Sequence, residues 1–181
     1  TERRGVTPAA AKNLLRSRPT LIAALMVERG EADAMISGLV GRFHKKLGYM
    51  RSIFDFDPGV SGTSAMTGVI NDQGAWFFLD THVQVDPTAE QIAEATLQAT
   101  YRLKLFGIEP KVGMLSYSTL GSGKGPDVDI VEEATKLLKE KAPDLPVVGS
   151  IQFDAAWSPT VAATKAKGND VAGHVNVFVF P

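Results

Sequence analysis

Hydroxyl groups, glycines and one lysine crowd residues 116–127, the segment whose side chains could hold an anion. The sequence there is Ser-Tyr-Ser-Thr-Leu-Gly-Ser-Gly-Lys-Gly-Pro-Asp. Glycines permit positive φ, which lets successive N–H groups converge on one point, and Lys124 adds a full positive charge. The segment lies between an apolar run at 111–115 and a helical pattern at 128–141, so a helix N-terminus would add unpaired donors. Composition supports equally an anion-binding loop and an ordinary solvated loop capped by Asp127.

Known phosphate-binding fingerprints do not match this segment. Lys124 is followed by Gly125 rather than Ser or Thr, and position 118 holds no glycine, so the segment is not a P-loop. Pro126 breaks the dinucleotide pattern GxGxxG. No serine is framed by GxSxG, which leaves a hydrolase nucleophile without support.

Three further residues follow predicted strands, where open α/β sheets collect ligand-contacting side chains. Asp154 comes at the end of a predicted strand over 147–153, and its alternative role is to cap the following turn. Ser37 and Gly38 hold the same kind of position after a short predicted strand at 34–36. The three histidines are far apart without metal-ligand spacing, so we expect no metal site.

The composition is that of a globular protein without a strong charge bias. The chain has 181 residues, 44% of them hydrophobic, a net charge of −1 and no cysteine. We therefore expect no disulfide, no nucleic-acid partner and no membrane partner, and a cytoplasmic location. The chain begins at Thr1 without methionine and ends at Pro181 after a predicted strand, so we interpret it as a fragment of a longer protein.

Helical and strand patterns alternate along most of the chain. The predicted helices are 8–16, 19–28, a helix from the Ser37-Gly38 turn to about 54, 88–106, 128–141 and 158–165. The predicted strands are 34–36, 64–70, 75–79, 111–115, 147–153 and 174–180. This order predicts a three-layer α/β/α fold with a mainly parallel sheet, made mixed by a hairpin at 71–74. Residues 31–181 are expected to form the α/β domain, with 1–30 as a helical lead-in.

Several stretches together resemble the phosphate acetyltransferase/butyryltransferase family. They agree with the middle part of that family's sequence in order and spacing: Gly30–Gly38, Asp86–Ala93, Phe106–Val112, Met114–Thr119, Gly125–Val128, Gln152–Ala156, Val171–Gly173 and Val177–Pro181. The family transfers an acetyl group between coenzyme A and phosphate in a cleft between two α/β domains. The resemblance implies that the 1–30 lead-in belongs to the neighbouring first domain. The resemblance implies that a phosphate or coenzyme A cleft is lined by Ser37, Gly38, Ser116, Ser118, Thr119, Ser122, Gly123, Lys124 and Asp154.

The resemblance also implies that no catalytic residue lies in this chain. The family's catalytic serine, arginine and aspartate belong mostly to a C-terminal Ser-Arg-Gly segment that this sequence does not contain. A substrate-contacting arginine that usually follows the Ser-Gly pair aligns with Gly48, which has no side chain to clamp a phosphate.

The Gly41-Arg42-Phe43 variant is similar to the acetyltransferase-like domain at the C-terminus of bacterial hybrid NADP-dependent malic enzymes. This implies a parent enzyme that decarboxylates malate to pyruvate with NADP and a divalent metal, both bound outside this chain. The appended domain would be non-catalytic, form a homo-oligomer and respond to acetyl-CoA as an effector. The alternatives are the central part of an active phosphate acetyltransferase and, more distantly, a dinucleotide-binding domain.

Overall fold

The computed structural model describes residues 5–181; residues 1–4, part of the expected 1–30 segment, lie outside the described residues. The chain divides into two compact units, Thr1–Val60 and Ser61–Pro181. The third helix packs against the second and so belongs to the first of these units. The predicted boundary between residues 30 and 31 stays a prediction.

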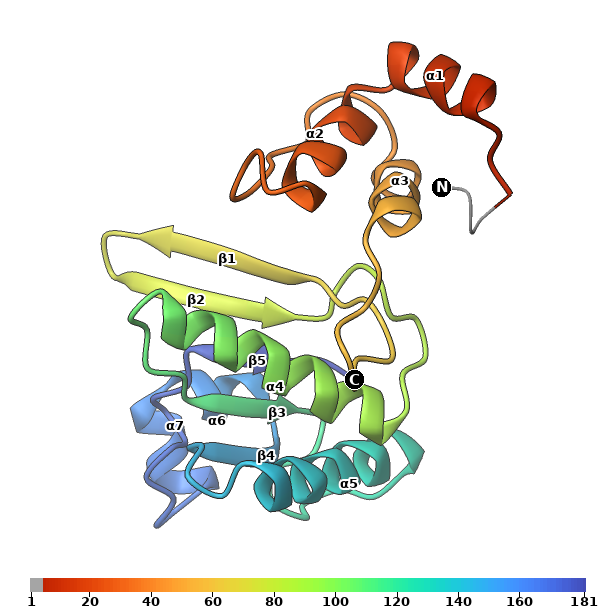
Figure 1. Cartoon of the computed structure of the whole chain (residues 1–181). Coiled ribbons are helices and arrows are strands. Elements are labelled where there is room, and N and C mark those ends of the chain that lie inside the picture. Colours follow the sequence, from red (N-terminus) through yellow and green to blue (C-terminus); the bar gives the residue numbers. More distant parts are fainter. Residues whose placement is uncertain (1–4) are drawn as a thin grey trace. The chain divides into compact units, whose positions relative to one another are not determined.

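The first unit contains three helices, α1 (Pro8–Ser17), α2 (Pro19–Glu28) and α3 (Phe43–Ile53) (Figure 1). The helices over 8–16 and 19–28 are confirmed. The hydroxyl of Thr7 caps α1 by accepting a hydrogen bond from the Ala10 N–H at 3.3 Å, with Pro8 at the first helical position.

Two predictions in the first unit are wrong. The strand at 34–36 does not form, and Ile36 is fully exposed there. The third helix begins at Phe43 instead of directly after Gly38. Leu39 and Gly41 have φ values of 62° and 93°, which a right-handed helix cannot contain. The segment before α3 is therefore a loop.

The second unit is built on one sheet, in which β1 and β2 form an antiparallel hairpin and the other neighbours are parallel. Its strands are β1 (Met66–Asn71), β2 (Gly74–Leu79), β3 (Val112–Leu115), β4 (Val147–Ile151) and β5 (Val177–Val179). Their spatial order is β1-β2-β5-β3-β4 (Figure 1). The mainly parallel, mixed sheet is confirmed.

Helices cover the sheet on two faces. They are α4 (Ala89–Leu105) and α5 (Pro126–Lys141) on one face, and α6 (Phe153–Trp157) and α7 (Pro159–Lys165) on the other. Val112 and Met114 of β3 pack into the first core with α4 and α5, while Leu115 packs into the second core with α6 and α7. This alternation along one strand produces the predicted three-layer α/β/α arrangement.

Two details around the candidate site differ from the predictions. Helix α5 begins at Pro126 with Gly125 as N-cap, so Asp127 lies in the first turn instead of capping it. Strand β4 stops at Ile151, and Asp154 lies in the first turn of α6, a short helix that the sequence did not predict. Among residues 5–181, no helix combines the length and the apolar character needed to cross a membrane.

Candidate functional site

The loop between β3 and α5 is closed by one buried hydroxyl. Ser118 is fully buried; its Oγ donates a hydrogen bond to the Gly123 carbonyl at 3.2 Å and accepts one from the Gly123 N–H at 2.9 Å. The Tyr117 hydroxyl donates to the Lys124 carbonyl at 3.2 Å. These cross-loop bonds fix the position of the segment that carries Lys124. Lys124 itself is exposed to solvent.

The other hydroxyls of this loop also bind its backbone. Ser116 Oγ donates to the Ser118 carbonyl at 3.0 Å and accepts from the Ser118 N–H at 2.9 Å. Ser122 Oγ accepts from the Thr119 N–H at 2.9 Å. The N–H groups of Ser118, Thr119 and Gly123 are thus taken by the loop's own hydroxyls. The hydroxyls make the loop rigid and leave Ser122 and Lys124 at its exposed surface.

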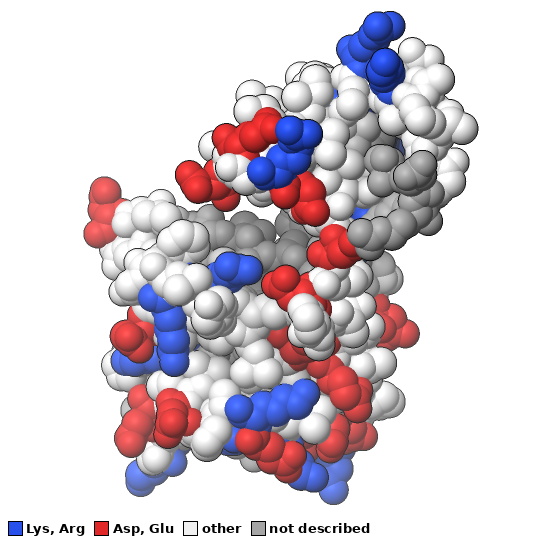
Figure 2. Space-filling model, in the orientation of Figure 1, with Lys and Arg blue, Asp and Glu red and all other residues white. Residues whose placement is uncertain are grey.

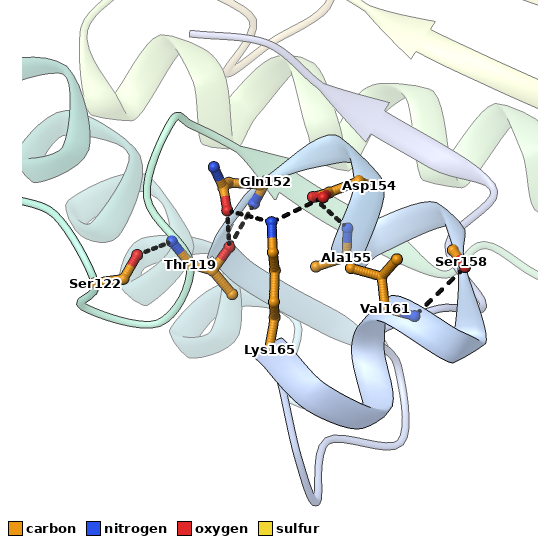
Figure 3. Close-up of polar contacts among 8 residues, drawn as sticks. All are labelled: Thr119, Ser122, Gln152, Asp154, Ala155, Ser158, Val161 and Lys165. Carbon is orange, nitrogen blue, oxygen red and sulfur yellow. Dashed lines mark hydrogen bonds and ion pairs between the residues drawn. The ribbon is translucent and has the colours of Figure 1, made fainter.

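Asp154 is joined to this loop through Gln152 and Lys165 (Figure 3). The Lys165 ammonium donates to Asp154 Oδ2 at 2.8 Å and to Gln152 Oε1 at 3.0 Å. Thr119 Oγ1 donates to the same Gln152 oxygen at 3.2 Å and accepts from the Gln152 N–H at 3.1 Å. The structure therefore brings Asp154 and Thr119 into one hydrogen-bonded network through Gln152 and Lys165.

Lys165 is a residue that sequence reasoning missed. It lies in the last turn of α7, and its side chain reaches back to the start of α6. The position of Lys165 in the sequence does not indicate its contact with Asp154, because this contact depends on how the short helix α6 turns the chain before α7.

We predict that replacing Lys165 by methionine raises the Asp154 pKa toward its ordinary value. The Lys165 ammonium donates to the Asp154 carboxylate and holds its pKa below the usual range. A depressed carboxyl pKa stabilises the fold above the pKa of the unfolded chain, and this stabilisation is lost as pH falls through the folded pKa. A carboxyl NMR titration measures the effect. Lys167→Met, at an exposed lysine of the following turn, is the control that should leave the Asp154 pKa unchanged.

Ser37 and Gly38 lie in the first unit and line a cavity of about 470 Å³ there. The hydroxyls of Ser37 and Thr20 lie 3.1 Å apart, within hydrogen-bonding distance. Lys46, which also lines the cavity, donates from its ammonium to the Gly38 carbonyl at 2.8 Å. Lys46 and Thr20 were not predicted as site residues. The cavity thus combines two hydroxyls with one cation, a donor set that suits an anion.

A second cavity, of about 660 Å³, lies in the second unit beside the loop after β3. Leu120 and Gly121 of the loop line it, together with Lys136 and Lys139 of α5. Leu120 and Gly121 have positive φ values of 47° and 89°, and the Leu120 N–H donates to the Ser150 carbonyl at 2.8 Å. The two lysines lie one helical turn apart. That spacing is visible in the sequence and could have identified them as candidate site residues.

Charge differs between the two units. Residues 5–60 carry eight Lys and Arg against five Asp and Glu, whereas residues 61–181 carry nine against fourteen. On the face shown in Figure 2, acidic and basic side chains alternate over the second unit without a uniform basic area. Among the described residues, no three His, Asp or Glu side chains are grouped closely enough to hold a metal ion.

Comparison with known proteins gives one consistent match. The family model described as phosphate acetyl/butaryl transferase matches residues 1–181. The NADP-dependent malic enzyme of Escherichia coli K12 is 39% identical over 180 residues, which cover 99% of this chain and 24% of that protein. The phosphate acetyltransferase of Synechocystis is 42% identical over 178 residues, covering 98% of this chain and 25% of that protein.

A solved structure has a similar fold. The phosphotransacetylase from Streptococcus pyogenes superposes with a TM-score of 0.86 at 38% identity, covering 99% of this chain and 55% of that one. The chain thus spans about a quarter of the curated relatives and about half of this solved structure.

Proposed function

Because this chain belongs to the phosphate acetyl/butaryl transferase family, we propose that it is a domain that binds an acyl-CoA or a phosphate-bearing small molecule without itself transferring an acyl group. The protein that contains it is an NADP-dependent malic enzyme, which oxidises and decarboxylates malate to pyruvate elsewhere in its chain. The domain serves assembly and allosteric regulation by acetyl-CoA. NADP and the divalent metal bind to the malic domain only.

The observation that carries the non-catalytic half of this proposal is Gly48. By the family resemblance it takes the place of an arginine that contacts the anionic substrate in acetyltransferases, and it is exposed on α3. A Cβ added there would meet no atom within 4 Å, so packing does not explain the missing side chain. Lys46, on the same helix, already donates to the Gly38 carbonyl. The position that would clamp a phosphate therefore lacks a cation.

The loop after β3 supports the ligand-binding half. Its internal hydrogen bonds hold Lys124 on a rigid backbone, which lowers the entropy cost of binding an anion. Ser122, beside it, is exposed and adds a hydroxyl that is able to donate. Acetyl-CoA carries several phosphate groups, which match a lysine as a point charge.

The alternative function is the central part of an active phosphate acetyltransferase. It is favoured by the 42% identity to the Synechocystis enzyme, slightly above the 39% to the malic enzyme. In that reaction the coenzyme A thiolate attacks the carbonyl carbon of acetyl phosphate, and inorganic phosphate leaves with the electron pair of the broken C–O bond. The protein would mainly position two anionic substrates and stabilise developing charge.

The regulatory role predicts that acetyl-CoA changes the rate of malate oxidation by the protein that contains this chain. In the Lys124→Ala variant, we expect the acetyl-CoA concentration for half-maximal effect to rise about three- to tenfold, since one exposed charge-assisted hydrogen bond is lost. Lys167→Ala, at an exposed lysine outside the loop, should leave it unchanged. The rate of NADPH formation, measured over a range of acetyl-CoA concentrations, gives the half-maximal concentration for each variant. A rate indifferent to acetyl-CoA would remove the regulatory role.

A further inference from the structure

The cavity of about 660 Å³ in the second unit is lined by charged groups that have no role in the proposed function. Helix α5 contributes Glu132, Lys136, Lys139 and Glu140 to its lining. Strand β4, which packs against α5 (Figure 1), contributes Ser150. A cavity of this volume with a few convergent polar groups has the dimensions of a small-molecule site.

Both lysines of this cavity lack an anionic partner. Among residues 5–181, neither the Lys136 nor the Lys139 ammonium forms an ion pair with a carboxylate. Glu132 and Glu140 each lie four residues from Lys136, a spacing that allows such a pair. Like charges one helical turn apart repel each other, so the two lysines do not stabilise the helix. Two unpaired ammoniums on one turn suit the two phosphates of a diphosphate.

The other end of the cavity carries an acceptor instead of a cation. Ser150 is 1% exposed, and its Oγ donates a hydrogen bond to Glu132 Oε1 at 3.3 Å. This bond orients the carboxylate and leaves its Oε2 without a donor among the described residues. Leu120 lies at the same end, because its N–H donates to the Ser150 carbonyl at 2.8 Å, and it is 49% exposed. An oriented carboxylate accepts hydrogen bonds from ribose hydroxyls, and an exposed leucine packs against a base.

The spacing along α5 joins these two ends into one site. Lys136 and Lys139 lie four and seven residues beyond Glu132, which corresponds to about 6 and 10 Å along the helix axis. A ribose and the two phosphates that follow it extend over a comparable length. We propose that this cavity binds a nucleoside diphosphate, with the diphosphate on Lys136 and Lys139 and the ribose hydroxyls donating to Glu132. This inference does not rest on the function proposed above.

Glu132 makes this cavity unsuitable for coenzyme A. Coenzyme A carries a phosphate on its 3′-oxygen, and that phosphate would lie against the Glu132 carboxylate, where like charges repel. Glu140 lines the cavity next to Lys139 and weakens the binding of a diphosphate for the same reason. The cavity therefore takes a nucleotide with free 2′- and 3′-hydroxyls, and it is separate from the site proposed at Lys124.

Isothermal titration calorimetry of the 181-residue chain with ADP tests this site. We expect ADP to bind, and its Kd to rise about tenfold in the double variant Lys136→Met/Lys139→Met, because two charge-assisted hydrogen bonds are lost. Lys141→Met, at the last residue of α5 and outside the cavity lining, is the matched control and should leave the Kd unchanged. An absence of binding at about 5 mM ADP, or an equal loss in the control, would overturn the proposal.

Glu140→Gln gives a result that damage to the fold cannot produce. Removal of this carboxylate is expected to lower the Kd for ADP about two- to threefold. A Kd that stays the same or rises would contradict the placement of the diphosphate beside Lys139.

Competition with coenzyme A tests the role of Glu132. We expect coenzyme A to need at least a tenfold higher concentration than unlabelled ADP to displace radiolabelled ADP, and Glu132→Gln to reduce this difference. Equal displacement by the two compounds would contradict the assignment of the ribose to Glu132. If ADP binds as expected but malate oxidation does not respond to acetyl-CoA, only the regulatory role is lost.

Discussion

Replacement of Gly149 by alanine is expected to destabilise the second unit by about 3 kcal/mol. A Cβ at this position would lie 2.5 Å from the Met114 Cβ and 2.7 Å from Thr135 Oγ1. These atoms belong to β3 and α5, which both pack against β4, and the Met114 Cβ cannot yield without moving β3. Urea unfolding followed by tryptophan fluorescence measures the loss, because Trp76 and Trp157 both lie in this unit.

The control for this variant is Gly62→Ala, at a position where a Cβ meets no atom within 4 Å. Its free energy of unfolding should stay within about 0.5 kcal/mol of the wild type. Equal effects of the two substitutions would mean that the close packing of β3, β4 and α5 is absent in solution.

The second large effect is expected for Gly173→Ala, with a loss of about 3–4 kcal/mol. Gly173 has a φ of +79°, and a Cβ there would lie 2.7 Å from the Pro159 Cα and 3.0 Å from the Ala162 Cβ. The substitution therefore combines a left-handed backbone with a collision against the start of α7.

Gly168→Ala separates these two causes. Gly168 has a similar φ of +83°, but a Cβ there meets no atom within 4 Å. It should cost only the backbone strain, about 1 kcal/mol. The difference between the two variants in chemical unfolding isolates the packing against α7; a difference near zero would show that this contact contributes nothing.

Helix caps, turn residues and short apolar runs in the sequence correctly predicted the elements whose ends they determine. The Thr88 and Gln91 side chains both make the capping-box bonds that the sequence indicated, and α4 follows them. The hairpin at 71–74 and the central strands also agreed, because turn residues and short apolar runs specify them locally. The same signals failed at residues 34–36, where an apolar triplet without a partner strand stays in a loop.

The candidate site was predictable in part. The crowding of hydroxyls marked the loop after β3, but whether those groups face a ligand or one another depends on its closed shape, which Ser118 sets from a buried position. Lys165 bonds to Asp154, and Lys46 bonds to the Gly38 carbonyl, across intervening turns of the chain. Sequence spacing alone does not predict such contacts.

The most direct test of the proposed function is the formation of acetyl-CoA from acetyl phosphate and coenzyme A by the longer protein proposed to contain this chain. Gly48 has no side chain where the resemblance places a substrate-contacting arginine, so we predict no acetyl-CoA formation above the uncatalysed rate, while acetyl-CoA still changes the rate of malate oxidation. Steady formation of acetyl-CoA that Lys124→Ala reduces would contradict this account and establish the transferase alternative.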